Sequence, residues 1–373
     1  MRVLHILAQL RASGAEQMLR VAAPHWRSAG LDLHVLETSQ EPGHFRGALE
    51  AAGYSVHQLP LPRRVSSVTA LRDLIRAGAY DVVHIHPEGA DLIPGLAARL
   101  AGTPAVLRTV HHIYPYEGTL RTRKRLERRA NRMLGTRHIC NSRSGSANET
   151  EALHNPHRLV FNWYDDDHFR PPTPSQRAAA RAALGLSADD LAFVSVGGCA
   201  PYKNHDLILR ALARTPQVLY LHAGPEPDDS ERRLAQELGV ADRARFLGVV
   251  PDVLEVFHAA DGYLMPSSLE GFGIAAAEAM GCGVPAILGD RPALWDLKGL
   301  TPGTWVPLEP EPLAAAMQAL ATRPAAERRA EGEAASEAVK QRFGTATGAQ
   351  GYLDAYRDAL ALSRGSLVAH PTA

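Results

Sequence analysis

The sequence predicts an α/β protein built from two layered domains with parallel sheets, and three observations indicate this class. Its 373 residues are long for one domain and natural for two domains of ordinary size, each able to bury a core. Short apolar runs alternate with segments of helical period, which implies parallel strands joined by helical crossovers. A proline-rich stretch, FNWYDDDHFRPPTPSQ at 161–176, separates two such series.

The first series fills residues 1 to about 165 and predicts one layered domain. Its expected strands, in chain order, are VLHILA, LDLHVLE, YDVVHIH, AVLRTVHH and RHICNS. One helix is expected from about Glu16 and another over DLIPGLAARLAG at 91–102. Because strands and helices alternate, we expect the strands to pair in parallel.

The second series, within residues 166–344, predicts the same architecture again, although the two halves show no sequence repeat. Its expected strands are LAFVSVGG, QVLYLHAG, RARFLGVV, GYLMPSS and VPAILGD, with a helix from about His205. Between the series, Pro171, Pro172 and Pro174 forbid a continuous helix and suit an interdomain crossing. The tail RFGTATGAQGYLDAYRDAL is typical of one amphipathic terminal helix.

Composition excludes several classes of protein. Lys plus Arg equals Asp plus Glu at 40 each, so the charge balance indicates no nucleic acid or acidic surface as a partner. Cys140, Cys199 and Cys282 lie far apart, with neither metal-ligand spacing nor an even count, which fits a reducing compartment. The start MRVLHILAQLRASG is too short and too interrupted for a signal peptide or a spanning helix. We therefore expect a cytoplasmic protein.

Function is expected in the loops that follow strands, because open parallel sheets bind ligands beyond the carboxyl ends of their strands. In SSLEGFGIAAAEAMGCGVPAI, at 267–287, a strand is followed by the loop LEGFG and a helix start. Gly271 and Gly273 let the backbone approach a ligand, and the free N–H groups at Ile274 and Ala275 offer an anion site. This loop fits a phosphate.

The same segment carries two carboxylates. Glu270 precedes the helix and Glu278 lies about one turn past its start, so we expect them to flank a long ligand as acceptors for hydroxyl groups. The competing interpretation makes Glu278 a solvated residue and the glycines ordinary turn formers. Two further loops weigh against it, because Gly14 stands at another helix start and Lys203 follows a strand as a point charge for phosphate.

Together these segments resemble the retaining nucleotide-sugar glycosyltransferases of family 4, whose GT-B fold has two Rossmann-like domains facing each other across a deep cleft. The resemblance covers nearly the whole chain, from VLHILAQLRASGAEQ through DVVHIHPEGADLIPGLAARLAGTP to FLGVVPDVLEVFHAADGYLMPSSLEGFGIAAAEAMGCGVPAI. It implies an N-terminal acceptor domain at 1–165, a donor domain at 166–344, and a C-terminal helix at about 345–373 that returns to the N-terminal domain.

The resemblance also assigns a phosphate and ribose site. It implies that Gly14 bounds the donor diphosphate and that Lys203 contacts it. Backbone N–H groups of Ile274 and Ala275 would bind phosphate, and Glu278 would accept hydrogen bonds from the ribose hydroxyls.

The sugar end of the site follows from the same resemblance. Glu270 would lie beside the donor sugar, and the next three residues would offer backbone N–H groups to its hydroxyls: Gly271, Phe272 and Gly273. His111, in TVHH, matches the family histidine near the sugar and the reacting centre. The adjacent His112 is an alternative, and either ring could instead be a core histidine.

The implied reaction moves a hexosyl or N-acetylhexosaminyl group from a nucleoside diphosphate, with a UDP-sugar favoured, to a hydroxyl acceptor with retention. Such a reaction would serve the biosynthesis of a cell-surface polysaccharide, a glycolipid or a glycosylated metabolite. Lys203 and the helix starts would stabilise charge on the leaving diphosphate, so no metal and no cofactor is required. Asp165, Asp166 and Asp167 suggest a carboxylate–metal site, but such acids in a proline-flanked loop are usually solvated.

Two positions depart from the family pattern. Trp163 follows Asn162 where the family usually has Asn-Gly, so a large ring must be housed, either lining an acceptor pocket or packing between the domains. Gly198 stands where the family commonly has an arginine, five residues before Lys203. One cation for the diphosphate is therefore missing.

The segment RTRKRLERRANR at 121–132 holds seven basic residues against one acid. Such a patch fits peripheral contact with the anionic inner face of a membrane, and a solvated helix face is the competing interpretation.

Two rival functions share the nucleotide site. One is a sugar-nucleotide epimerase of GT-B fold, and the other is a non-catalytic, two-lobed sugar-nucleotide-binding protein.

Overall fold

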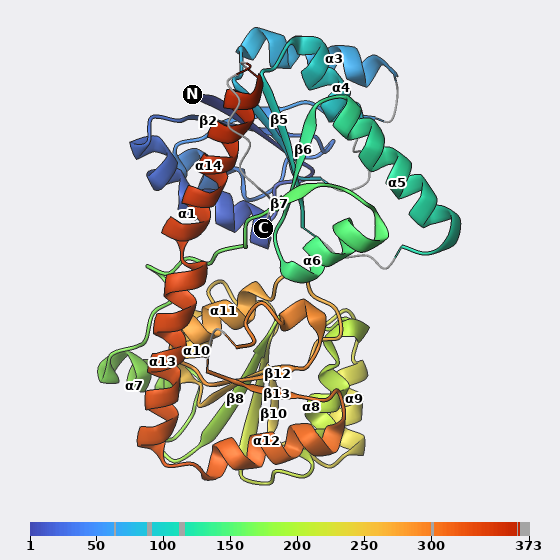
Figure 1. The fold of residues 1–373 in the computed structure, drawn as a ribbon. Coiled ribbons are helices and arrows are strands. Elements are labelled where there is room, and N and C mark those ends of the chain that lie inside the picture. Colours follow the sequence, from blue (N-terminus) through green and yellow to red (C-terminus); the bar gives the residue numbers. More distant parts are fainter. Residues whose placement is uncertain (63–64, 88–91, 112–115, 300–301, 364, 366–373) are drawn as a thin grey trace. The chain divides into compact units, whose positions relative to one another are not determined.

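A computed structural model describes residues 1–62, 65–87, 92–111, 116–299, 302–363 and 365. The chain divides into two compact units, Met1–Trp163 with Thr345–Ala373, and Tyr164–Gly344. Each unit is a parallel β-sheet flanked by helices (Figure 1). The predicted α/β architecture with two Rossmann-like domains is confirmed.

The sheet of the first unit has the strand order β3-β2-β1-β4-β5-β6-β7, and every neighbouring pair is parallel. Its strands are β1 (Arg2–Leu7), β2 (Asp32–Glu37), β3 (Ser55–Gln58), β4 (Val82–Ile85), β5 (Ala105–Val110), β6 (Thr136–Cys140) and β7 (His157–Leu159). The order reverses between β1 and β4. Open α/β sheets bind ligands at such a switch point.

The first unit's helices, in the described part of the chain, are α1 (Gly14–Ser28), α2 (Arg46–Ala52), α3 (Val65–Gly78), α4 (Leu92–Ala101), α5 (Gly118–Met133), α6 (Arg143–Ala147), a π-helical turn (Asn148–Ala152) and α14 (Thr345–Ser363). Figure 1 shows α14 alongside α1. The indole Nε1 of Trp26 donates a 2.9 Å hydrogen bond to the carbonyl of Ala349. The C-terminal helix therefore packs on the N-terminal domain, as predicted.

Trp163 belongs to the core of this unit. Its ring is 1% exposed and packs edge-on against Trp26 and Tyr352. Its Nε1 donates to the carbonyl of Met18 at 3.0 Å. A Cβ at Gly348 would stand 2.1 Å from the indole, so glycine is required where α14 passes the ring. Neither predicted place for Trp163 is correct, because a ring enclosed within one unit lines no acceptor pocket and has its packing partners in that unit.

The sheet of the second unit has the order β10-β9-β8-β11-β12-β13, again parallel throughout. Its strands are β8 (Leu191–Val196), β9 (Val218–Ala223), β10 (Ala244–Phe246), β11 (Gly262–Met265), β12 (Ala286–Gly289) and β13 (Thr304–Val306). Its helices are α7 (Pro174–Ala183), α8 (His205–Leu212), α9 (Ser230–Glu237), α10 (Leu254–Ala259), α11 (Ile274–Gly281), α12 (Pro310–Thr322) and α13 (Ala325–Phe343), with 3-10 turns at Pro201–Lys203 and Pro292–Leu294.

Local sequence explains where these elements begin and end. Central strands such as β8 and β11 are largely apolar because helices cover both faces of the sheet. Pro174 opens α7 as its first residue, where a missing N–H costs nothing, and Thr173 caps it in a capping box with Gln176. Among the described residues, no helix combines the length and apolarity needed to cross a bilayer.

Candidate functional site

The candidate site of the second unit lies at the carboxyl ends of β8 and β11. These two strands are neighbours in the sheet, and the strand order reverses between them. The chain leaves β8 through Gly197 and Gly198 and enters the turn Pro201–Lys203. It leaves β11 through the loop that contains Glu270 and then enters α11. The topology thus brings the two predicted phosphate loops side by side.

Hydrogen bonds tie these loops together. The amide Nδ2 of Asn204 donates to the carbonyl of Pro266 at 2.7 Å. Ser268 donates to the carbonyl of Tyr202 through its backbone N–H at 2.8 Å and through its hydroxyl at 3.1 Å. Asn204 adopts the left-handed conformation, with φ of 55°, which asparagine tolerates better than most residues. The turn is thereby held against the β11 loop.

Lys203 and Glu270 form an ion pair within this framework. Lys203 Nζ lies 2.6 Å from Glu270 Oε1, and their side chains are 19% and 12% exposed. The structure thus joins two residues that the sequence assigned separately to the diphosphate and to the sugar. Because both are partly shielded from water, their attraction is stronger than that of an exposed pair.

The close approach of the chain segments after β8 and β9 explains why glycines occur there. Gly197 has φ of 133°, and a Cβ at Gly224 would stand 2.0 Å from the carbonyl oxygen of Gly197. The ends of β8 and β9 can approach this closely only without that side chain. At Gly198 a Cβ would lie 3.3 Å from Cγ of Pro225, so a larger residue there requires the proline to shift.

Helix α11 begins at the place where the sequence predicts an anion site. Gly273 is its N-cap with φ of 85°, and no side chain caps the helix. The backbone N–H groups of Ile274 and Ala275 stand in the first turn, where the helix itself provides no acceptor. Both residues are half-buried, as is Gly271 before them. This geometry suits a phosphate or another anion.

Phe272 anchors the loop between Glu270 and α11. Its side chain is 1% exposed, and its ring lies 4.9 Å from that of Phe343 at an interplanar angle of 70°. Edge-to-face packing of this kind fixes the loop by burying a large apolar ring. The side chain therefore has a structural role, and only the backbone of Phe272 remains for a ligand.

Glu278 occupies the second turn of α11 and is half-buried. Burial, reinforced by the negative charges of Asp165 and Asp252, raises the pKa of its carboxyl group to about 8. Within the described part of the chain, its carboxylate has no hydrogen-bond or ion-pair partner. A carboxyl group held in this way is suited to accept hydrogen bonds from ligand hydroxyls, and the interpretation of Glu278 as a solvated residue is wrong.

In the first unit, Gly14 comes after β1 and His111 after β5, and β4 lies between these two strands in the sheet. Gly14 is the first residue of α1, with Ser13 as N-cap. His111 comes directly after β5 and is half-buried; its Nε2 lies 2.9 Å from Nδ1 of His86, and its carbonyl accepts from Asn141 at 3.1 Å. His112, the alternative to His111, lies outside the described residues.

Two clusters of potential metal ligands occur in the described structure, His5 with His84 and His86, and Cys199 with His205 and His222. Both ring nitrogens of His84 already meet hydroxyls, Tyr356 at 2.7 Å and Thr109 at 2.8 Å. His222 Nε2 lies 2.8 Å from the carbonyl of Gly197, so it carries a proton in that contact. The sequence did not predict either cluster, because strand pairing brings His5 beside His84 and His86, and brings His222 beside the segment that holds Cys199 and His205. Neither cluster includes Asp165, Asp166 or Asp167.

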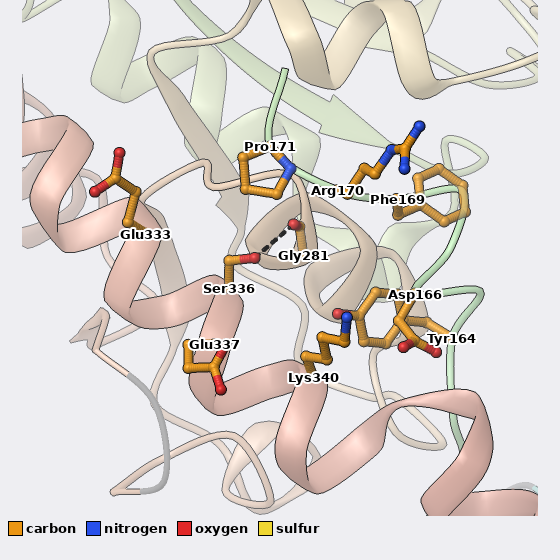
Figure 2. Close-up of a pocket in the computed structure, with 10 residues that line it drawn as sticks. All are labelled: Tyr164, Asp166, Phe169, Arg170, Pro171, Gly281, Glu333, Ser336, Glu337 and Lys340. Carbon is orange, nitrogen blue, oxygen red and sulfur yellow. Dashed lines mark hydrogen bonds between the residues drawn. The ribbon is translucent and has the colours of Figure 1, made fainter. Parts of the chain in front are cut away.

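A separate pocket of about 260 Å³ lies beside α13 (Figure 2). It is lined by Tyr164, Asp166, Phe169, Arg170, Pro171, Gly281, Glu333, Ser336, Glu337 and Lys340. The hydroxyl of Ser336 donates to the carbonyl of Gly281 at 2.8 Å, which joins α13 to the end of α11. None of the predicted site residues lines this pocket.

The basic segment predicted at 121–132 forms most of α5. Two of its cations are internal: Lys124 pairs with Glu127 at 2.7 Å, and the buried Arg128 pairs with Glu149 at 3.0 Å. Helix α5 also exposes three large apolar residues, Leu120 at 41% exposure, Leu126 at 62% and Met133 at 81%.

Two family models match the chain, one in each unit. The model described as Glycosyltransferase Family 4 matches residues 12–168, and the model described as Glycosyl transferases group 1 matches residues 176–337. The boundary between them falls just after the division between the two compact units.

Curated relatives match part of the chain. A D-inositol 3-phosphate glycosyltransferase of Mycobacterium sp. (strain KMS) is 32% identical over 252 residues, which are 61% of this chain and 56% of that protein. One from Saccharomonospora viridis is 35% identical over 229 residues, 56% of this chain and 52% of that protein. The chain thus spans about half the length of the curated relatives it matches.

Solved structures match nearly the whole of this chain. Anabaena Alr3699/HepE, crystallised with UDP and glucose, superposes with a TM-score of 0.82 at 21% identity, covering 96% of this chain and 100% of that one. A glycosyltransferase from Rickettsia africae ESF-5 gives a TM-score of 0.81 at 15% identity, covering 96% and 98%. At these identities the likeness concerns the fold.

Proposed function

Because the chain belongs to the family 4 glycosyltransferases of the GT-B fold, we propose that it transfers a sugar from a nucleoside diphosphate to a hydroxyl acceptor with retention at the anomeric carbon. The observation that carries this proposal is the Lys203–Glu270 pair, held 2.6 Å apart beside the uncapped start of α11. A cation and a row of backbone N–H groups suit a diphosphate, and a carboxylate suits sugar hydroxyls.

In this proposal each end of the donor has its own residues. Lys203 and the N–H groups of Ile274 and Ala275 bind the diphosphate and stabilise the charge that develops on it as it leaves. Glu278 accepts the ribose hydroxyls, since its carboxyl group is half-buried and without a protein partner in the described structure.

The remaining assignments complete the donor site. Glu270 and the backbone of Gly271, Phe272 and Gly273 bind the sugar. From the first unit, Gly14 bounds the diphosphate and His111 lies near the reacting carbon. Residues 1–165 with the C-terminal helix form the acceptor domain, and residues 166–344 form the donor domain.

We propose a UDP-sugar as the donor, supported by the solved neighbour that holds UDP and glucose. The names of the curated relatives make a phosphorylated inositol the first acceptor to test. In the proposed site, Lys203 and helix N–H groups take the place of a metal ion, so we expect activity to persist in the presence of a chelator.

Helix α5 supports a membrane partner. Leu126 and Met133 are seven residues apart, which places them on one face of the helix, and exposed Arg123 and Arg129 lie to either side of that line. An apolar ridge between cations suits the interface of an anionic bilayer. We propose peripheral contact through this face.

The assay that tests the proposed function compares UDP release from UDP-glucose with and without acceptor alcohols, inositol phosphates first. A transferase releases UDP only when an acceptor is present. An epimerase changes the sugar of the donor without any acceptor, and a binding protein does neither. Either of those results would contradict the proposal.

A further inference from the structure

Three imidazoles form a hydrogen-bonded chain through the first unit. His5 Nδ1 lies 3.0 Å from His86 Nε2, and His86 Nδ1 lies 2.9 Å from His111 Nε2. His5 is in β1, His86 follows β4 and His111 follows β5, and these three strands are consecutive in the sheet. The rings of each pair are stacked, at interplanar angles of 28° and 26°.

The inner two rings are neutral. His5 is fully buried and His86 is 4% exposed. Burial lowers the pKa of His5 to about 3. Burial, with the neighbouring rings of His84, His111 and His5, lowers the pKa of His86 well below its usual value. A neutral imidazole has one N–H and one acceptor nitrogen, so the hydrogen bonds of the chain must all run in the same direction.

The innermost ring decides that direction. Nε2 of His5 is buried and has no hydrogen-bond partner among the described residues. A buried N–H without an acceptor is rare and costly, so the proton of His5 belongs on Nδ1, which donates to His86. His86 is then protonated on Nδ1 and donates to Nε2 of His111.

We infer that His86 is a positioning residue that fixes the tautomer and ring orientation of His111, and that His5 in turn fixes His86. Nε2 of His111 is the acceptor of this contact, so the neutral ring carries its proton on Nδ1 and presents it as a donor. The inference rests on the proposed function in so far as His111 lies near the donor sugar. A hydrogen bond from behind commonly sets which imidazole nitrogen is protonated.

His84 provides a matched control. It lies two residues before His86 on the same stretch, is equally buried, and its ring centroid is 4.2 Å from that of His86. Its nitrogens, however, contact the hydroxyls of Tyr356 and Thr109, so it stands outside the chain that reaches His111.

Three substitutions separate the contacts of His86. In His86→Asn the amide nitrogen can take the place of ring Nδ1 and still donate to His111. In His86→Gln the longer amide takes the place of Nε2 and reaches His5 only. His86→Phe keeps a ring and removes both hydrogen bonds. We expect Asn to retain turnover within a few-fold, and Gln and Phe to lower kcat by about tenfold to a hundredfold, as loss of a supporting hydrogen bond to a functional histidine typically does.

The deciding measurement is a long-range proton–nitrogen correlation spectrum of the full chain labelled on histidine, with His111 assigned by comparison with His111→Gln. We expect wild type and His84→Asn to show His111 protonated on Nδ1, His86→Asn to preserve that state, and His86→Phe to give a mixture of tautomers. A proton on Nε2 of His111 in wild type would overturn the inference, as would an unchanged tautomer in a folded His86→Phe.

Wild type and His86→Asn keep the test decisive if His86→Phe fails to fold. Because the spectra are recorded without substrate, the tautomer test remains valid even if the chain transfers no sugar. Loss of the proposed function alone would therefore leave the tautomer result standing.

Discussion

The ammonium of Lys203 lies 2.6 Å from the carboxylate of Glu270, and this pair joins the two loops at the switch point of the second sheet. In the donor complex that we propose, Lys203 turns to the diphosphate while Glu270 accepts sugar hydroxyls. The pair therefore holds both groups in place before the donor arrives. Lys203 must give up part of this ion pair to bind the diphosphate, so Glu270 competes with the donor for the ammonium group.

Lys203→Ala should lower turnover by at least about a hundredfold, because removing a charge-assisted contact to a developing charge costs about 3 kcal/mol or more in the barrier. The substitution also leaves Glu270 partly buried without its cation. Lys203→Arg should recover only part of the activity, since the planar guanidinium of arginine does not fit the place of the compact lysine ammonium. Steady-state kinetics at saturating donor measure both effects.

Arg214→Ala is the matched control for this lysine. Arg214 also forms a 2.6 Å ion pair, with Glu311, but both side chains are about half exposed and lie away from the strand ends that form the site. We expect wild-type turnover from this variant. If Lys203→Ala itself kept more than about a tenth of wild-type turnover, another cation would hold the diphosphate and the proposed phosphate site would be wrong.

Glu270→Ala should abolish transfer and leave UDP affinity intact or somewhat tighter. The sugar loses its carboxylate partner, whereas Lys203 is released from its ion pair and is free for the diphosphate. Isothermal titration with UDP and with UDP-glucose separates the two effects. An equal loss of affinity for both ligands would show that Glu270 does not lie at the sugar end.

Donor affinity should depend on the ionisation of Glu278. Accepting two ribose hydroxyls favours the carboxylate, but in the free protein the pKa is raised to about 8, so binding below that pH must first remove a proton. The affinity for UDP-glucose should therefore rise with pH from about 6 and level off above about 8. Titration of Glu278→Gln, in which affinity should be weaker and independent of pH, is the control; a matching slope in this variant would contradict the assignment.

The same group predicts how stability changes with pH. A folded pKa near 8, above the usual value of 4.5, means that the fold favours the neutral carboxyl group, so stability is lost as pH rises between these values. Glu278→Gln cannot ionise. Its Tm should exceed that of wild type at about pH 8.5, and this gain should shrink towards about pH 4.5. A Tm gain that is constant across this range would show that the side chain does not titrate in this way.

Membrane contact through α5 should need its exposed apolar ridge. Leu126→Ser with Met133→Ser should weaken binding to vesicles rich in phosphatidylglycerol, because both side chains are largely exposed and their burial in lipid is lost. Leu159→Ser, at a partly exposed leucine on β7, is the control. Cosedimentation at low salt checks this, and equal binding by all three proteins would exclude α5 as the contact.

Much of the fold could be predicted because its central strands are apolar runs with helical segments between them. The shorter strands β3, β7 and β13 were missed. β3 (SVHQ) and β7 (HRL) are the two edge strands of the first sheet and have no continuous apolar pattern. The expected strand RARFLGVV is confined to Ala244–Phe246, where it pairs with β9.

The site was predictable residue by residue but not in its contacts. Lys203 and Glu270 are separated by 67 positions, and only the adjacency of β8 and β11 brings them together. The imidazole chain likewise draws on three strands, and an isolated histidine in a strand gives no sign of its partner. Trp163 was misplaced because its enclosure depends on Gly348 in a helix at the other end of the chain.

The central claim is transfer with retention, and the anomeric configuration of the first product measures it directly. Proton NMR should follow the reaction of UDP-α-glucose with an accepted alcohol from its earliest turnover. The account predicts an α-linked product that accumulates one-for-one with UDP and none without the alcohol. A β-linked product, or a changed sugar nucleotide without released UDP, would contradict it.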